Sequence, residues 1–334
     1  MREAPSTWSQ SESSALFGAM HAVAVGGADR ELTRVEKGLI EGAAEHIFDV
    51  DGVDADALTD VTPDELAAAI TDPEHRSTAI QMLVLVPYAD TTVDSPEVAV
   101  VDGYADALGQ HPNTLRDLHQ VRDLHIKRLL VDYGRRSIGA FSENTEYGPM
   151  RTAARFIHQY IGDSHVTERW TALEGYPEGS LGHTFFVFYR DRGFPLPGEH
   201  HGTGELFVGH DSSHILSGTN TDGPSELEVA GFEAGMSADG FGYEMLLEVI
   251  LDYHMGIDFG ASSVGIEPKT GEFDPDRVTT GIRRGIDCNV DLIRDWDFWS
   301  VADVPVLELR ERYNILGDRP AVMEPPEFQR TDWH

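Results

Sequence analysis

Two histidines and two acids lie close together in the segment GHDSSHILSGTNTDGPSE, which ends at Glu226. His210 and His214 are four residues apart, so on a helix their rings would share one face, one turn apart. This spacing is typical of histidine pairs that bind a metal ion. Asp211 would be rotated by about 100° from His210, where it could reach the ion at its edge or orient an imidazole.

The stretch between the histidines and Glu226 predicts a tight connection between two helices. Residues 217–224 read SGTNTDGP and are rich in residues that favour turns. We expect a second helix over residues 225–236, with Ser225 as its N-cap, so that Glu226 faces the two imidazoles. A chance pairing of histidines near abundant acids is the alternative.

Other side chains could compete for the same role. Glu228 and Glu233 lie on the same expected second helix as Glu226. Further imidazoles are those of His183, His200, His201 and His254. The predicted metal ligands are His210, Asp211, His214 and Glu226.

The composition is that of a globular protein with an unusual charge. The chain has 334 residues, 40% of them hydrophobic, and a formal net charge of −33. So acidic a surface repels nucleic acid and anionic lipid at ordinary salt, and it argues against a nucleic-acid partner. We interpret the acidity as a halophilic adaptation, because about 1 M salt shortens the Debye length to about 3 Å and screens carboxylate repulsion.

The lone Cys288 rules out an internal disulfide and any cysteine-based zinc site. No apolar run approaches the roughly eighteen residues of a membrane span. The N-terminal stretch MREAPSTWSQSESS has no apolar signal-peptide core. We therefore expect a cytoplasmic protein.

The first 140 residues contain an internal repeat. Residues 26–47 align without a gap with residues 87–108, at an offset of 61. Each copy predicts an apolar helix, a short turn and a second helix that opens with a capping box, Thr33 to Glu36 in one copy and Asp94 to Glu97 in the other. Thr62 to Glu65 predicts a third capping box.

This repeat resembles the tellurite-resistance TerB-like domain over roughly residues 15–139. The resemblance implies an all-helical domain whose acidic turns have been proposed to bind metal. Helix caps and dipole complementarity explain the same acids without a metal. The acids concerned are Asp29, Glu36, Asp90, Asp94 and Glu97.

The second half of the chain predicts further helices. Apolar periodicity and turn residues indicate helices over residues 150–161, 184–190, 240–256, 287–293 and 304–313. The helix over 240–256 is apolar nearly all round, so it either packs in the core or lines a groove. The expected class is all-α.

Four spaced residues of this half are similar to the signature of the ubiquinone (coenzyme Q) biosynthesis family Coq-four: His-Asp-x-x-His, eleven residues, then Glu. Residues 177–182, PEGSLG, are similar to that family's Pro-x-Gly-Thr-x-Gly segment. Phe232-Glu233 and the LELR segment at 307–310 also match. The basic and aromatic residues that usually flank the signature are absent, and His183 stands where an arginine is usual.

The resemblance implies an all-helical protein that holds a divalent metal, zinc or else iron, beside a groove for a polyprenyl chain. Its metal ligands would be His210, Asp211, His214 and Glu226, which are also the expected catalytic residues. It implies a metal-dependent lyase, acting in oxidative decarboxylation of a prenylated quinone precursor. Contact with quinone-biosynthesis proteins, peripheral contact with the inner face of the membrane and homo-oligomers are compatible with it.

Two alternatives stay open: a non-catalytic lipid-binding scaffold for a quinone-biosynthesis complex, and a metal-stress protein in which the TerB-like half dominates. The expected organisation is a TerB-like domain at 1–140, a connecting helix or linker at 141–174, a Coq-four-like metal-binding domain at 175–317 and a tail at 318–334.

Overall fold

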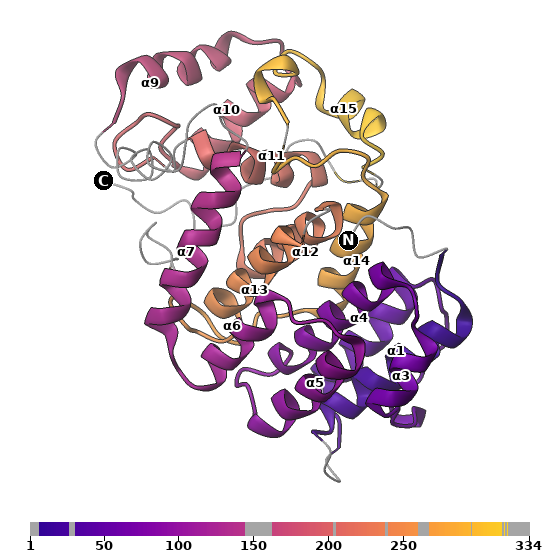
Figure 1. Cartoon of the computed structure of the whole chain (residues 1–334). Coiled ribbons are helices and arrows are strands. Elements are labelled where there is room, and N and C mark those ends of the chain that lie inside the picture. The colour runs from indigo at the N-terminus through magenta and orange to yellow at the C-terminus, as the bar shows by residue number, and fades with distance from the viewer. Residues whose placement is uncertain are drawn as a thin grey trace.

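The computed structural model describes most of the chain as helices joined by short loops (Figure 1). The described residues are 7–26, 31–143, 162–202, 205–237, 240–259, 267–294, 296–315, 317 and 319. Within these ranges there is no strand, and only two isolated bridges pair extended backbone. The all-α prediction is confirmed.

The N-terminal half is built from the predicted repeat. One copy forms α1 (Gln10–Ala24) and α2 (Arg34–Gly42), which continues as a π-helical turn, and the other forms α4 (Pro73–Leu85) and α5 (Ser95–Leu108). The short α3 (Pro63–Ala69) lies between the two copies in the chain.

Two of the three predicted capping boxes are confirmed. At the start of α2, the Glu36 amide donates to Thr33 Oγ1 at 3.2 Å, and the Thr33 amide donates to Glu36 Oε2 at 2.6 Å. Thr62 and Glu65 make the same reciprocal pair at α3.

The third predicted capping box, at the start of α5, is wrong. Asp94 occupies the N-cap position but makes no side-chain capping bond. A proline lies in the first turn of α5 instead. Proline has its φ fixed near the helical value and no N–H to satisfy, so it starts a helix without help from a cap.

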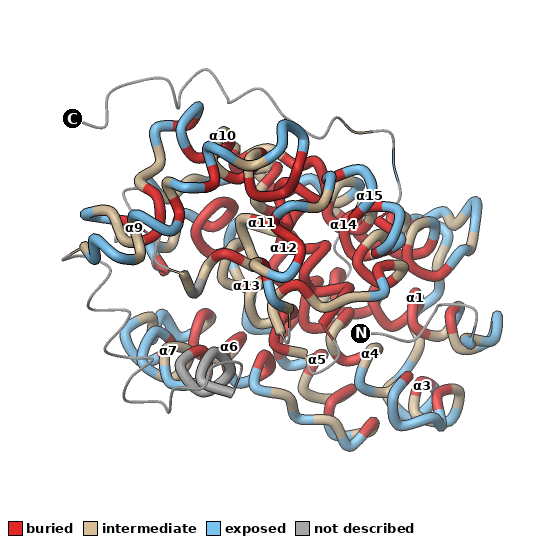
Figure 2. Tube along the Cα trace, turned by 90° about the horizontal axis from the view of Figure 1, so that it is seen from above, coloured by how far each residue is buried: buried red, intermediate tan, exposed pale blue. Residues whose placement is uncertain are grey.

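Two helices lead from the repeat toward the second half. They are α6 (Asn113–Arg122) and α7 (Ile126–Glu143), and α7 lies at the edge of the molecule in both views (Figures 1 and 2). The helix predicted over residues 150–161 lies outside the described residues.

Among the described residues, the second half of the chain contains seven α-helices. Helices α10, α13 and α15 confirm the helices predicted near residues 184–190, 240–256 and 304–313. The bounds are α9 (Ser164–Thr171), α10 (Leu181–Arg192), α11 (Val208–Ser217), α12 (Gly223–Met236), α13 (Phe241–Tyr253), α14 (Pro275–Asp287) and α15 (Val306–Arg312).

The helix predicted over residues 287–293 is wrong, because α14 ends at Asp287. Beyond it the chain turns. The side chain of Asp291 accepts hydrogen bonds from the amides of Ile293 and Arg294, both at 3.0 Å, and the Asn289 amide donates to the Tyr313 carbonyl. These local and long-range bonds take the place of the helical ladder.

Two apolar cores meet at α12. Residues of α1 to α7 form one core with side chains such as Leu227, Tyr243 and Val278. Residues of α9 to α11 and α15 form the other with Phe232 and Met236. Figure 2 shows this central region as buried. Both cores draw on α12, and the division into domains at 1–140 and 175–317 stays a prediction.

Glycines allow α12 and α14 to touch backbone to backbone. A Cβ on Gly235 would lie 2.1 Å from the Ile282 carbonyl oxygen, and one on Gly285 would lie 2.0 Å from that of Phe232. Real Cβ atoms do not approach so closely, so only glycine permits this crossing. The position of α12 is therefore fixed by direct backbone packing.

Among the described helices, none combines the length and the apolar character that crossing a lipid bilayer requires.

Candidate metal centre

The predicted histidine pair and Glu226 lie on two consecutive helices. His210 and His214 are on α11, which ends at Ser217 and is capped by Gly218 in the left-handed conformation (φ 70°). Glu226 is in the first turn of α12. The N-cap of α12 is Asp222, which accepts from the Ser225 amide at 3.1 Å, so the predicted Ser225 cap is wrong. The intervening loop turns the chain back as expected.

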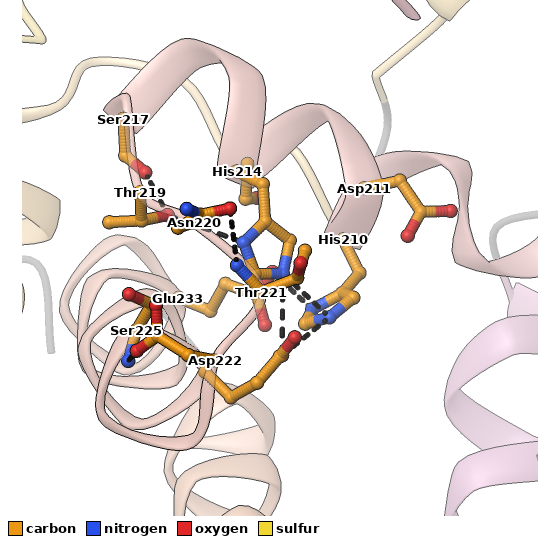
Figure 3. Close-up of polar contacts among 12 residues, drawn as sticks. His210, Asp211, His214, Ser217, Thr219, Asn220, Thr221, Asp222, Ser225 and Glu233 are labelled. Atoms are coloured by element: carbon orange, nitrogen blue, oxygen red, sulfur yellow. Dashed lines mark hydrogen bonds and ion pairs between the residues drawn. The ribbon is translucent and has the colours of Figure 1, made fainter. Parts of the chain in front are cut away.

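The three side chains converge on one point. His210 Nε2 and His214 Nε2 are 3.3 Å apart, and Glu226 Oε2 lies 3.3 Å from His214 Nε2 and 3.6 Å from His210 Nε2. Figure 3 shows the two imidazoles facing each other below α11. We call His210, His214 and Glu226 the His/Glu group. It is one of two groups of candidate donors among the described residues.

The spacing of these donors fits a small tetrahedral cation. Two donors at 2.0–2.1 Å from zinc, separated by the tetrahedral angle, stand about 3.3–3.4 Å apart. Donors at right angles, as in octahedral coordination, would stand about 2.9 Å apart at the same bond length. The measured 3.3, 3.3 and 3.6 Å lie closer to the tetrahedral value.

Each imidazole is oriented through its other nitrogen. His210 Nδ1 lies 3.0 Å from Glu233 Oε1, and a carboxylate can only accept, so Nδ1 carries a proton and Nε2 is the nitrogen that faces His214 and Glu226. His214 Nδ1 lies 3.3 Å from Thr219 Oγ1. If His214 donates there, both Nε2 lone pairs and the Glu226 carboxylate point at the same space. Three electron-rich atoms this close require a proton or a cation between them.

The electrostatics agree with this requirement. Burial alone lowers the pKa of His210, but the carboxylates of Glu233 and Glu226 outweigh burial and raise that pKa well above its usual value. Burial alone raises the pKa of Glu226, yet the imidazoles of His214 and His210 outweigh it and hold that pKa well below its usual range. The site therefore favours a positive charge beside Glu226.

The His/Glu group is not sealed on all sides. The side chain of His214 is 2% exposed, whereas those of Glu226 and His210 are 13% and 21% exposed. The group is partly exposed on the side of His210 and Glu226, while His214 and the fully buried Glu233 lie on its inner side.

Asp211, the fourth predicted ligand, lies apart from the other three. Figure 3 shows its carboxylate pointing away from the imidazoles, and it is outside the group of converging donor atoms. It accepts a hydrogen bond from the Tyr189 hydroxyl on α10. Burial raises the pKa of Asp211, against the lowering effects of His210 and Tyr189. The geometry suits a carboxyl group beside the site better than a ligand within it.

The rival side chains have other contacts. Glu228 forms ion pairs with Arg277 at 2.8 Å and Arg319 at 2.6 Å, on the side of α12 away from the imidazoles. His254 lies 2.9 Å from the Ala89 carbonyl oxygen. His183, His200 and His201 belong to no converging donor group among the described residues.

Three arginines hold the end of α11 and the following loop. The Arg310 guanidinium donates to the carbonyls of Ile215 and Leu216, both at 2.8 Å, and Arg284 donates to that of Ser217 at 2.6 Å. These carbonyls belong to the last turn of the helix, where cations are favourable. The backbone turn that follows His214 is thus held by side chains of α14 and α15.

The third of these, Arg192 on α10, is 1% exposed and donates to the Asn220 side chain at 2.8 Å and to Thr221 Oγ1 at 3.3 Å. Burial lowers the pKa of Arg192 to about 10. Its charge also acts on Glu226. The loop that brings Glu226 to the imidazoles is therefore anchored by a buried cation.

A second set of acids lies in the repeat. Glu36, Asp90 and Glu97 offer carboxylate oxygens within 4.8 Å of one another, and we call them the acidic group. Glu36 serves the α2 capping box, and the Thr33 hydroxyl donates to Asp90 Oδ1 at 3.2 Å. Of the other acids in the TerB-like pattern, Asp29 lies outside the described residues and Asp94 is not part of the group.

Comparison with known proteins assigns no family. No protein-family model matches the chain, and no curated protein matches it. Among solved structures, the crystal structure of a candidate ubiquinone biosynthesis protein from Nostoc punctiforme aligns with 73% of this chain and 99% of its own, at 18% identity and a TM-score of 0.31. A likeness at this level establishes no shared function, so the site is argued from its own residues.

Proposed function

We propose that His210, His214 and Glu226 hold one divalent cation, zinc in preference to iron, and that the protein uses it in quinone or prenyl-lipid metabolism. The observation that carries the proposal is the convergence of two imidazole nitrogens and one carboxylate oxygen at 3.3–3.6 Å from one another. Three protein donors with an open position are typical of catalytic zinc sites, whereas structural sites use four.

A zinc ion held in this way would polarise a substrate carboxylate or carbonyl, or activate water, and iron held by the same residues would also activate dioxygen. The chain's own residues prepare the site for it. Glu233 keeps the proton of His210 on Nδ1, and Thr219 contacts the corresponding nitrogen of His214. The buried Asp211, hydrogen-bonded to Tyr189 and with a raised pKa, is placed to hold a proton beside the group.

The proposed substrate class comes from the resemblance to the Coq-four signature. It is a prenylated aromatic ring that carries a carboxylate, and the proposed reaction is its oxidative decarboxylation, in which the carboxylate leaves as carbon dioxide, a hydroxyl group takes its place and dioxygen accepts the two electrons. The apolar helix α13 was expected either to pack in the core or to line a groove. Its residues Leu246 and Ile250 are fully buried in the first core, so we assign the prenyl chain no place on this face.

The experiment combines metal analysis with turnover. We expect about one equivalent of zinc in the purified wild-type protein and a loss of that zinc in His214→Ala. Mass spectrometry of copurified lipid should detect a prenylated ring compound in both. Absence of stoichiometric metal from wild type would overturn the proposal.

The same variants separate an enzyme from a scaffold for quinone-biosynthesis proteins. An enzyme would lose turnover in His210→Ala while it still assembles with its partners. Normal quinone intermediates in cells that carry only His210→Ala would favour the scaffold instead. Circular dichroism of both variants controls for unfolding.

A further inference from the structure

A buried histidine of the second half takes no part in either group of candidate donors. His254 directly follows α13, is 3% exposed and belongs neither to the His/Glu group nor to the acidic group. Its Nε2 lies 2.9 Å from the carbonyl oxygen of Ala89, and its Nδ1 lies 3.2 Å from the amide nitrogen of Phe273. The imidazole therefore connects the turn after α4 to the segment that precedes α14.

These two contacts define the protonation of the ring. A carbonyl oxygen only accepts, so Nε2 donates to Ala89, and an amide N–H only donates, so Nδ1 accepts from Phe273. His254 is thus held as the neutral imidazole. A second proton on Nδ1 would point at the Phe273 N–H, and a ring turned over by 180° would lose both bonds. The charged form of His254 therefore keeps at most one of its two partners.

Three histidines of the repeat have partners of a different kind. His21, His46 and His119 each have a ring nitrogen within 2.8 Å of an aspartate oxygen. A carboxylate accepts from a charged imidazole even better than from a neutral one, so these contacts survive protonation. The three side chains are also 16–34% exposed, so water can solvate their charge. Of these four histidines, only His254 combines burial with an N–H group as a partner.

The charged groups around His254 do not offset its burial. Burial lowers the pKa of His254, against the raising effects of the Ala89 carbonyl and of Asp90 on the repeat. Carboxylates on the other elements packed around it have contacts of their own: Asp252 accepts from the Phe259 amide at 2.7 Å, Glu272 lies 3.5 Å from Lys269 Nζ, and Asp274 caps α14.

The bonds of His254 lie where the two halves of the chain meet. Phe273 is 5% exposed and comes shortly before α14, which packs on α2 of the repeat and on α12. The His254 carbonyl also accepts from the Gly271 amide at 2.9 Å. Loss of the bonds of the ring would therefore loosen the start of α14 from the repeat.

We propose that His254 is an acid-sensitive latch between the repeat and the start of α14. At neutral pH the neutral ring bonds both segments, and the latch is closed. Its pKa in the closed form lies below the value of about 6.5 for an exposed histidine. The stabilisation is therefore complete above about pH 6.5 and is lost as the pH falls from there toward the closed-form pKa, because the open form takes up the proton first.

The latch does not depend on the proposed metal centre, and hydrogen exchange measured by mass spectrometry tests it in the full-length protein. Exchange is compared between about pH 7 and pH 5 at constant salt and corrected for the intrinsic rate. Protection of the segments around Ala89 and Phe273 should fall by up to about tenfold per pH unit below about 6.5, because one proton is taken up on opening.

Two variants assign this pH dependence to one side chain. His254→Gln keeps an amide N–H that can donate toward Ala89, but it does not titrate. Its protection at about pH 7 should be about fivefold lower than in wild type, since the bond from the Phe273 amide is lost, and should change far less between pH 7 and pH 5. The control is His111→Gln, the same change at a side chain that is 60% exposed, which should keep the pH dependence of wild type.

Two results would overturn the proposal. One is equal protection of these segments in wild type at both pH values, or a His254→Gln variant with the full pH dependence of wild type. The other needs no variant, so it holds even if His254→Gln fails to fold. Nitrogen-15 NMR of wild type at about pH 7 should show His254 with a proton on Nε2 and none on Nδ1, and the opposite tautomer would exclude the latch.

Discussion

Two groups of candidate metal donors lie in this molecule, and they differ in what surrounds the donors. In the His/Glu group, His210 is oriented by Glu233 and His214 by Thr219, contacts that serve to direct the donor nitrogens. In the acidic group, the contact of Glu36 with Thr33 completes a helix cap. Proximity of donors is common to both. The His/Glu group differs from the acidic group because neighbouring side chains orient its donor atoms toward one point.

The donor atoms differ as well. Imidazole nitrogen with one carboxylate suits zinc and ferrous iron, whereas carboxylates alone suit magnesium, calcium or manganese. Three carboxylates in close contact also repel one another unless a cation or a proton lies between them. The two groups should therefore differ in metal preference, with zinc or iron at the His/Glu group and magnesium, calcium or manganese at the acidic group.

The largest expected effect comes from removing a donor. His214→Ala should lower zinc affinity by more than about 100-fold, since even partners of the ligands contribute 10–100-fold. Isothermal titration calorimetry with zinc after chelation measures this. Glu97→Gln, the matched change in the acidic group, should leave zinc affinity unchanged. Loss of zinc binding in Glu97→Gln would show instead that the acidic group of the repeat binds the zinc.

A slightly smaller effect is expected from the partner of His210. Glu233→Gln should weaken zinc binding by about 10–100-fold, because the imidazole loses the carboxylate that fixes its tautomer. The control is Glu228→Gln, an equally buried acid on the same helix whose partners are arginines. That variant should lower stability but keep zinc affinity. Equal zinc affinities in the two variants would contradict the role given to Glu233.

The packing that positions α12 can be tested through its glycines. Gly235→Ala should lower the free energy of unfolding by about 1–3 kcal/mol, because its Cβ would overlap the Ile282 carbonyl. Gly103→Ala in α5 should be neutral or stabilising by up to about 1 kcal/mol, since its Cβ would meet only Pro63 Cγ at 3.5 Å. Urea denaturation of both variants gives the comparison. Equal effects would argue against a tight helix crossing.

The smallest effect concerns Glu248, a carboxylate near His210 that lacks the close imidazole contacts of Glu226. Burial raises the pKa of Glu248 to about 7, against the hydrogen bond from Tyr133. Its folded-state pKa is above the unfolded value, so its ionisation removes stability as the pH rises from about 4.5 through 7. Glu248→Gln should therefore stabilise by about 1–2 kcal/mol at pH 8 and by little at pH 5, since the group is only half-buried. A stabilisation that is greater at pH 5 would reverse the assigned sign.

Much of the candidate site could be predicted from local rules. The four-residue spacing placed His210 and His214 on one helical face, and turn residues placed Glu226 opposite them. Helical periodicity also indicates that Glu233 faces the histidines, because it is seven residues after Glu226 and therefore on the same face of α12. Glu228 is two residues after Glu226 and so faces elsewhere.

Other features depend on contacts between distant segments. The partner of Asp211 is Tyr189, 22 residues earlier on another helix, and nothing in either segment indicates the other. The same holds for Arg310, which reaches the carbonyls of α11 from 94 residues away. Tertiary bonds also overrode the helical pattern that was expected after Asp287, where the Asn289 amide bonds the Tyr313 carbonyl.

The backbone crossing of α12 and α14 limits where the chain can be cut. On its far side α14 lies against α2, where a Cβ on Gly42 would be 2.7 Å from Thr279 Oγ1. A fragment beginning at residue 175 would lack the helices that pack on Leu227, Tyr243 and Val278. These apolar side chains would then be exposed to solvent and would promote aggregation. The repeat thus covers apolar side chains of the histidine-bearing half, and we expect that half to lose solubility without it.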